Sequence, residues 1–399
     1  MRSVYLPFHI PSIGEEEVAE VVDTLRSGWL TTGSKTARFE DDFCRYTGAR
    51  YAVAVSSGTA ALHLALAAMG LRAGEEVIVP TLTFAASAEV VCYLGGIPRF
   101  VDVNPRTLTI DVEAVEAVLR AGREGRTIRA ILPVHYGGYP CDMDPLMDLS
   151  KRYRVAVIDD AAHALPTFYK GRMVGTLADV TAFSFYATKT ITTGEGGMLT
   201  TANQDWASAM RMMSLHGITQ DAWKRYAKGG SWYYEIARLG YKYNLSDIAS
   251  SLGIQQLRKC DDFLRRREAV ARRYTDAFSG CPGIDLPEST RTSCGTPHGA
   301  MRHAWHLYPI LLDLERLSID RARFIEELKG CNIGSSVHFI PLHLHPFYQN
   351  HFGYRPGAFP VAEDFYAKCV SLPIYPRMTD EETVEVAEAV TELVDRFKR

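Results

Sequence analysis

Between residue 51 and about residue 200, short apolar runs alternate with segments whose apolar residues recur at a helical spacing. The short, β-branched runs predict strands, and the segments between them predict helices that connect parallel strands. The predicted strands are 51–55, 76–80, 97–101, 129–134, 154–158, 180–185 and 197–201. Repeated strand–helix–strand units indicate an α/β fold with a mainly parallel, seven-stranded sheet flanked by helices.

The segment 51–71 carries no formally charged residue and is long enough to resemble a membrane span. The run Ser56-Ser57-Gly58-Thr59 divides it into a short β-branched part and a part rich in alanine and leucine. This division is typical of a buried strand that turns into a helix. We therefore expect no membrane partner.

The remaining pattern predicts a second, smaller region after the main sheet. The predicted helices are 59–69, 83–94, 204–214, 246–277, 320–328 and 379–397, with a further strand at 306–312. The aromatic, glycine-rich segment 217–240 is interpreted as a loop or arm, and 280–299 as a loop. We predict a large domain over 1–255 and a smaller C-terminal α/β domain over 256–399.

Composition narrows the class of protein. The 399 residues are 47% hydrophobic, which is enough for one large core and a second, smaller one. The 44 Lys and Arg residues do not exceed the 47 Asp and Glu residues, so we expect no nucleic-acid partner. The eight cysteines form no CxxC pair, and the N-terminus shows no secretory pattern, so reduced thiols and a cytoplasmic location are expected.

The first chemical feature is the run Ser57-Gly58-Thr59, which follows a predicted strand and opens a predicted helix. Amide groups at the start of a helix bind anions, and glycine allows a phosphate to approach closely. Taken alone, a serine or threonine at this place is more often a simple helix cap.

The second feature is a pair of carboxylates, Asp159 and Asp160, at the carboxyl end of a predicted apolar strand. Ligands bind at this end of α/β sheets, and only one of two adjacent strand residues can point inward. A carboxylate there could keep a pyridine nitrogen protonated, which makes the ring an electron sink. The alternative is a strand-end aspartate that caps the next turn.

The third feature is Lys189, in a predicted turn between two apolar strands and before the glycine-rich run 193–197. Burial would lower the pKa of this amine and suit it to form an imine, although strand-end lysines are usually surface charges. The lysine follows Asp160 by 29 positions. Together the three features predict a pocket for pyridoxal 5'-phosphate (PLP), whereas nucleotide-loop, zinc-protease and serine-hydrolase motifs are missing.

Seven motifs give the chain a resemblance to the DegT/DnrJ/StrS-type sugar aminotransferases, which are fold type I PLP enzymes. They follow the family order over nearly the whole chain. They are the runs 27–33 (SGWLTTG), 57–62 (SGTAAL), 133–138 (PVHYGG), 160–164 (DAAHA), 184–189 (SFYATK), 194–197 (GEGG) and 240–247 (GYKYNLSD).

The resemblance implies roles for individual residues. Lys189 would be the Schiff-base lysine and general acid/base, Asp160 the partner of the ring nitrogen, and His163 the residue that lies against the ring. Phe84 would make a further aromatic contact. The phosphate would be held by Ser57, Gly58, Thr59 and Ser184.

Other residues are assigned to the substrate or to a neighbouring subunit. The resemblance implies a homodimer with shared active sites, in which Lys242 or Asn244 reaches the partner's phosphate. This Lys242/Asn244 variant is similar to the branch of the family that makes UDP-4-amino-4-deoxy-L-arabinose. Trp29 and Thr31 would contact substrate, as would His338. The histidine-rich run that follows His338 lacks an acidic or cysteine partner at ligand spacing, so no metal is expected.

The predicted function is therefore amino transfer from an amino acid, L-glutamate, to a nucleotide-linked keto sugar at C4. Three alternatives stay open: a PLP-dependent sugar dehydratase, a non-catalytic regulator that senses PLP or a sugar nucleotide, and a PLP enzyme for small amino acids. The dehydratase branch has histidine in place of the Schiff-base lysine, and Lys189 argues against it.

Overall fold

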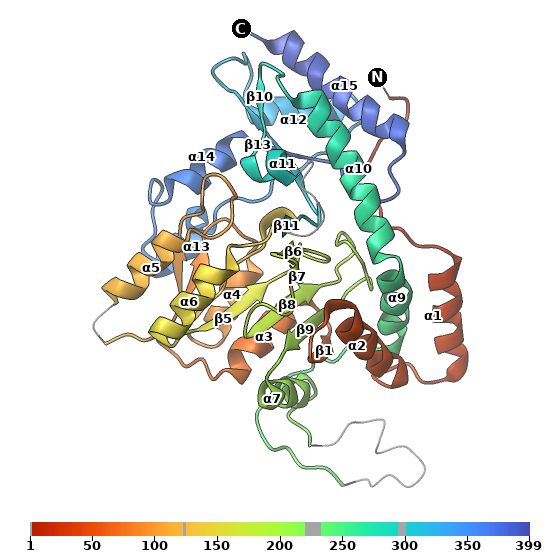
Figure 1. The fold of residues 1–399 in the computed structure, drawn as a ribbon, viewed down its shortest axis with the longest axis vertical. Helices are drawn as coiled ribbons and strands as arrows, with labels where there is room; N and C mark the ends of the chain where they lie inside the picture. Colours follow the sequence, from red (N-terminus) through yellow and green to blue (C-terminus); the bar gives the residue numbers. More distant parts are fainter. Residues whose placement is uncertain (1, 123–124, 220–232, 294–300) are drawn as a thin grey trace.

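The computed structural model describes residues 2–122, 125–219, 233–293 and 301–399 (Figure 1). Its largest element is a seven-stranded sheet with the order β1-β9-β8-β5-β4-β2-β3. These strands are β1 Tyr51–Val55, β2 Glu76–Pro80, β3 Ile97–Val101, β4 Ile128–Ile131, β5 Ala156–Asp160, β8 Val180–Ser184 and β9 Gly197–Thr201. All seven predicted strands are confirmed, but β5 begins and ends two residues later than predicted and so includes both aspartates.

The direction of the strands agrees with a mainly parallel sheet. Strands β3, β2, β4, β5 and β8 pair in parallel, whereas β9 runs antiparallel to β8 and to β1. An antiparallel neighbour can be reached by a short turn, while a parallel one needs a crossover. The connection from β8 to β9, residues 185–196, carries no helix and returns directly to the neighbouring strand, and Lys189 lies in it beyond the carboxyl end of β8.

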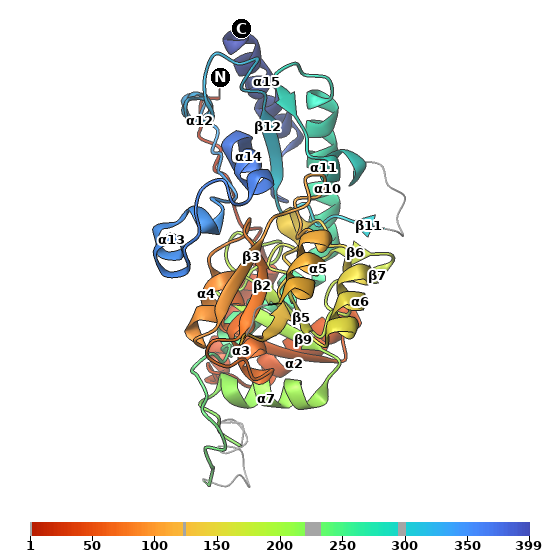
Figure 2. The same ribbon diagram turned by 90° about the vertical axis from the view of Figure 1, so that its left-hand side faces the viewer.

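Helices cover both faces of this sheet, as the alternation of its side chains requires. Along β1, Ala52 and Ala54 join one apolar cluster, while Val53 and Val55 join another. The first cluster packs α2 Ser34–Thr47, α5 Val112–Ala121, α6 Met143–Tyr153 and α9 Asp247–Arg258 against the sheet. The second packs α3 Gly58–Ala68, α4 Ala86–Tyr93 and α7 Gln204–Ser214 on the opposite face (Figures 1 and 2).

The uncharged segment 51–71 is divided as predicted, into β1 and α3. Seven consecutive residues of α3, from Ala60 to Leu66, are buried between the sheet and its neighbours. Burial on all sides explains why this helix lacks a polar face. None of the described helices combines the length and the apolar composition that a membrane crossing requires.

Two N-terminal helices, α1 Glu15–Ser27 and α2, were not predicted. The buried side of α1 includes Glu17, whose carboxylate accepts from Lys259 Nζ at 2.8 Å, so apolar periodicity does not reveal the helix. The start of α2 has no capping side chain of its own. Asp247 caps it from a distance, accepting from Gly33 N at 2.8 Å and from Thr36 N at 2.9 Å.

The C-terminal part has its own core beside the main sheet (Figure 2). A three-stranded antiparallel sheet, β10-β12-β13, packs with three helices and with Leu6 from the N-terminus. These elements are β10 Ile284–Asp285, β12 Tyr308–Leu312, β13 Cys369–Leu372, α10 Cys260–Phe278, α12 Arg321–Gly330 and α15 Asp380–Phe397. The predicted helix 246–277 is two helices, α9 and α10, that meet at Lys259, and the domain boundary at residue 255 stays a prediction.

Shorter elements complete the fold. They are β6 Phe168–Tyr169, β7 Arg172–Met173, β11 Met301–Arg302, α11 Glu288–Ser293, α13 Pro346–Phe352, α14 Pro360–Lys368 and two 3-10 turns, Tyr136–Gly138 and Leu342–Leu344. The prediction of one loop over 280–299 was wrong in part, because β10 and α11 lie within it. Most of the predicted aromatic arm, residues 220–232, lies outside the described residues.

Candidate active site

A cavity of about 380 Å³ lies where β5 and β8 end and α3 begins. Its other wall comes from the C-terminal part and from the N-terminal residues Phe8 and His9. Nine predicted site residues line it: Ser57, Gly58, Thr59, Phe84, Asp160, His163, Ser184, Lys189 and His338. Residues that are far apart in the sequence therefore meet at the place where α/β sheets bind ligands.

One end of the cavity is the phosphate cradle, which we define as Ser57, Gly58, Thr59 and Ser184. Ser57 caps α3 by accepting from Ala60 N at 3.0 Å, and the backbone amides of Gly58 and Thr59 have no acceptor within the helix. A Cβ on Gly58 would lie 2.9 Å from the Cβ of Ser184, so only glycine allows α3 to sit this close to β8. Amides, hydroxyls and a helix N-terminus in one place fit a phosphate group.

Asp160 and Asp159 point to opposite faces of β5, and Asp160 faces the cavity. Burial raises the pKa of the Asp160 carboxyl. Ser87 Oγ donates to Asp160 Oδ2 at 2.7 Å and Ala162 N to Oδ1 at 3.1 Å, and both bonds favour the carboxylate form. Asp159 is fully buried and lies 3.4 Å from His135 Nε2.

Lys189 lies in the turn between β8 and β9, where its backbone N donates to Tyr186 O at 2.9 Å. Thr192 Oγ1 and Thr193 N both donate to Phe185 O at 3.0 Å and hold the turn in shape. Burial of the Lys189 amine lowers its pKa to about 8, and the attraction of Asp160 opposes this shift. The amine is therefore partly neutral near physiological pH, as a nucleophile must be.

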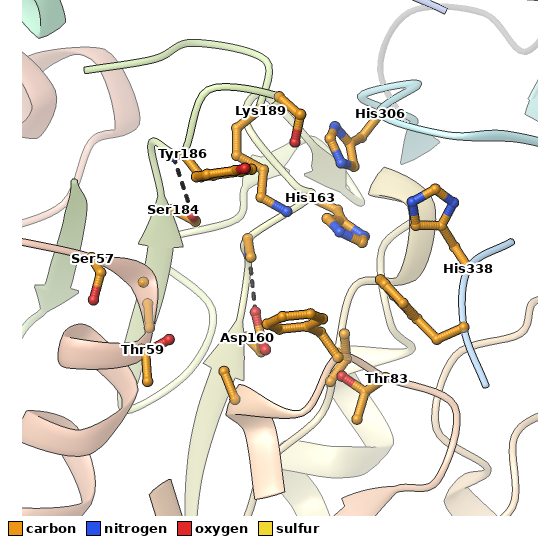
Figure 3. A pocket seen from close by; sticks show the side chains of 18 of the residues that line it. Ser57, Thr59, Thr83, Asp160, His163, Ser184, Tyr186, Lys189, His306 and His338 are labelled. Atoms are coloured by element: carbon orange, nitrogen blue, oxygen red, sulfur yellow. Dashed lines mark hydrogen bonds between the residues drawn. The ribbon is translucent and has the colours of Figure 1, made fainter. Parts of the chain in front are cut away.

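The opposite end of the cavity is the histidine wall, which we define as His9, His163, His306 and His338. Figure 3 shows three of its members, His163, His306 and His338, on one side of the Lys189 amine, and Ser57 and Thr59 of the cradle on the other. His9 and His306 were not predicted as site residues. Both adjoin residues that pack into the C-terminal core, Leu6 and Ile10 on either side of His9 and Tyr308 after His306, so only the tertiary contact reveals them.

His163 is held by two contacts. Gly137 N donates to His163 Nδ1 at 3.3 Å, so the remaining proton of the neutral ring lies on Nε2. The ring packs against His306, with centroids 4.2 Å apart and the two planes tilted by 33°. Burial, and then the charge of Lys189, lower the pKa of His163 well below its usual range.

Phe84 lines the cavity with 61% of its surface exposed, and its ring centroid lies 6.0 Å from that of Phe339. An exposed aromatic face of this size beside the cavity suits a planar ring or a sugar.

Four predicted site residues lie outside this cavity: Trp29, Thr31, Lys242 and Asn244. They adjoin one another, because Asn244 Nδ2 donates to Thr32 Oγ1 at 2.7 Å and Trp29 Nε1 donates to Thr32 O at 3.2 Å. Lys242 Nζ also bonds to Asn244 Oδ1. The resemblance assigned Lys242 or Asn244 to the partner's phosphate, which a single chain does not test.

The comparison with known proteins decides the class. A model of the DegT/DnrJ/EryC1/StrS aminotransferase family matches residues 11–391. The chain belongs to this family. It is 49% identical to the uncharacterized protein MJ1066 of Methanocaldococcus jannaschii over 394 residues, which cover 99% of both chains. It is 46% identical to the spore coat polysaccharide biosynthesis protein SpsC of Bacillus subtilis, with 98% of each covered.

Solved structures agree with this assignment. The putative sugar aminotransferase Spr1654 of Streptococcus pneumoniae matches in its pyridoxamine-phosphate and PLP forms with a TM-score of 0.88 and 34% identity. The match covers 98% of this chain and 99% of that one. The protein is thus a PLP-dependent sugar aminotransferase with the type I fold, and the alternatives of a regulator and a dehydratase lose their support.

Proposed function

We propose that this aminotransferase moves an amino group from L-glutamate to C4 of a nucleotide-linked keto sugar. The observation that carries the proposal is the cavity that joins a buried amine, Lys189, to a buried carboxylate, Asp160, beside an anion cradle. The Lys242/Asn244 variant and the likeness to a polysaccharide biosynthesis protein support a nucleotide-linked sugar as the acceptor.

In this proposal Lys189 holds the cofactor and moves the substrate's proton. Bound PLP supplies an aldehyde and a ring that withdraws electrons from the substrate carbon. Because the pKa of Lys189 is about 8, its amine can both accept and return a proton near neutral pH. A lysine with an unshifted pKa would be almost entirely protonated there.

Asp160 and His163 would orient the ring. The two hydrogen bonds to Asp160 leave its carboxylate fixed toward the cavity, where it would keep the ring nitrogen protonated. His163, packed against His306, would lie against the ring, with Phe84 as a further aromatic contact. The cradle residues Ser57, Gly58, Thr59 and Ser184 would hold the phosphate.

The proposal includes a homodimer with shared active sites and a cytoplasmic location. Trp29, Thr31, Lys242 and Asn244 adjoin one another outside their own cavity, as expected if they serve the partner's cavity. Mixing two inactive variants, Lys189→Ala and the double variant Lys242→Ala/Asn244→Ala, should then restore activity, because one active site of each hybrid dimer is intact. Recovery of no activity in proven hybrids would contradict shared sites.

The chemistry is tested with purified enzyme, L-glutamate and a panel of UDP-, GDP- and dTDP-linked keto sugars. We expect a PLP absorption band in the wild-type protein and an amino sugar product from at least one UDP-linked 4-keto sugar, detected by mass spectrometry. The Lys189→Ala variant should lose the band of covalently held PLP and all turnover. A variant without that band that still aminates a keto sugar would refute the role of Lys189.

A further inference from the structure

The histidine wall brings together side chains from four separate parts of the chain. His9 comes from the N-terminal segment and His163 follows β5, while His306 precedes β12 and His338 lies between α12 and the second 3-10 turn. In Figure 3, His306 and His338 lie beyond the Lys189 amine as seen from the phosphate cradle. The substrate end of the cavity is therefore rich in imidazole.

Several ring nitrogens of this wall have no hydrogen-bond partner among the residues that the structure describes. His306 is only 7% exposed, and its Nδ1 is buried without a partner. His338 uses Nδ1 to bond to Ser371 Oγ at 3.0 Å, which leaves Nε2 available to the cavity. His9 Nε2 is likewise buried without a partner. Buried polar atoms are nearly always paired, so unpaired nitrogens on two rings that line the cavity, beside the free Nε2 of His338, suit a cavity that takes a hydrogen-bonding ligand.

Burial and nearby charges both shift the pKa values of the histidines in this wall. Burial is the largest cause that lowers the pKa of each, to about 4 in His338 and about 3 in His9, and well below the usual range in His306. The charge of Lys189 lowers all three pKa values further, and that of Arg267 acts on His306 and His9. The carboxylates that line the cavity are Asp160 and Glu195.

Lys189 is the one lysine among the described lining residues, and no arginine is present among them. If the proposed function is right, this cavity must take an amino acid with a negative carboxylate and, in the other half of the reaction, an uncharged sugar ring. An arginine would pair well with the carboxylate of the amino acid. With the uncharged sugar ring bound, the same arginine would be a buried charge without a partner, which is costly. A neutral imidazole avoids this cost, because it can gain a charge only when the carboxylate is present.

We propose that His306 and His338 form the subsite for the carboxylate of the amino donor, and that one of them takes up a proton from solvent as the carboxylate binds. In this step an N–H bond forms on the imidazole while hydronium or a buffer acid gives up the proton, and no bond between heavier atoms changes. The bound carboxylate pairs with the new imidazolium, and the proton returns to solvent when the keto acid leaves. The neutral rings can then accept hydrogen bonds from the sugar hydroxyls or donate hydrogen bonds to the sugar oxygens. This subsite deepens the proposed function and rests on it.

The sign of the pH effect follows from linkage. The rings are neutral in the free cavity at pH values well above 4, and a neighbouring carboxylate raises their pKa. A carboxylate ligand should therefore bind more tightly as pH falls, by up to about tenfold per pH unit when one proton is taken up. A neutral ligand of the same shape should show no such dependence.

The test is calorimetric titration of the PLP-loaded enzyme with glutarate, a dicarboxylate without an amino group. Titrations at one pH in two buffers with different ionisation heats count the protons taken up. We expect uptake of up to about one proton per site with glutarate, and none with glutaramide. The cofactor's absorption band, recorded in parallel, reports any protonation at the Lys189 nitrogen and separates it from protonation of histidine.

Two variants identify which histidine takes up the proton. His306→Phe keeps a ring to pack against His163, and His338→Asn keeps a group that can bond to Ser371, but neither new side chain can take a proton. At least one should abolish the proton uptake and weaken glutarate binding about tenfold. His351→Gln, on the exposed side of α13, serves as the control and should leave both unchanged. Thermal unfolding verifies that each variant is folded.

The proposal is overturned if glutarate does not bind, if it binds without proton uptake, or if all uptake appears in the cofactor band. Unchanged uptake in both folded variants would also overturn it. Failure of the proposed function looks different, since glutarate would then bind with proton uptake while no nucleotide-linked keto sugar is aminated. Amination of keto sugars without proton uptake would leave the function standing and remove the subsite.

Discussion

The two ends of the cavity are built in opposite ways. The phosphate cradle consists mainly of consecutive residues, Ser57 to Thr59, whose amides and helix dipole carry a partial charge that does not titrate. The histidine wall consists of single residues from four distant segments, and every one of them can titrate. A group that stays bound throughout the reaction suits fixed amides, whereas substrates that alternate in charge suit side chains that can change theirs.

The largest effect on kcat is expected from a substitution of Asp160, which lies in the cavity between the cradle and the histidine wall. Asp160→Asn removes the charge that faces the cavity and should lower kcat by about 10²–10³-fold, the range for one preorganised electrostatic contact. Asp159→Asn is the matched control, because Asp159 faces His135 on the other side of β5. That control should lower the free energy of unfolding while kcat per folded molecule changes little. Equal losses of kcat in both variants would contradict the assignment.

A change in the cradle should affect the cofactor and spare the substrate end. In Gly58→Ala the new Cβ would lie 2.9 Å from the Ser184 Cβ, so α3 must shift away from β8. Overpacking of this kind costs about 1–3 kcal/mol, which corresponds to about 5- to 150-fold weaker PLP binding if it acts on the bound state. Gly330→Ala, where a Cβ meets nothing within 4 Å, is the control. Equilibrium dialysis measures the dissociation constant of PLP for both variants.

The pH dependence of covalent PLP binding tests the lowered pKa of Lys189, whose amine lies between the cradle and the histidine wall. The pKa of Lys189 is lowered to about 8, so the neutral, reactive amine is lost as pH falls below that value. The rate at which the apoenzyme binds PLP covalently should decrease about tenfold per pH unit below pH 8 and level off above it. Stopped-flow absorbance gives the midpoint. It should move lower in Asp160→Asn, because Asp160 raises the pKa of Lys189, and an unmoved midpoint would argue against their interaction.

The smallest effect is expected from the cap of α3. Ser57→Ala removes the acceptor for Ala60 N and should lower the free energy of unfolding of the apoenzyme by about 1 kcal/mol, measured with urea. Thr379→Ala removes the cap of α15, far from the cavity, and should cost a similar amount. PLP binding should weaken in the first variant alone, and a loss in both would show that the effect is general stability.

Much of the fold was visible in the pattern of apolar residues. All seven strands of the main sheet were predicted, because a buried strand between two helical segments leaves a short β-branched run. Helices α1 and α2 were missed because their contacts are in part polar, such as Glu17 with Lys259 and Asp247 with the start of α2. Such contacts leave no periodic signal in the sequence.

The residues alone were enough to predict the family and the cofactor, which the comparisons confirm, and to predict the local parts of the site: the cradle, the aspartate pair and the lysine turn. Short-range backbone geometry governs these parts, so consecutive residues suffice to reveal them. The tertiary structure supplies the physical reason why Asp160, which the resemblance indicated, and not Asp159 faces the cavity: the register of β5 within the sheet turns Asp160 to that side. It alone also brought His9 and His306 to His163 and His338, because such contacts exist only once the C-terminal core packs against the sheet.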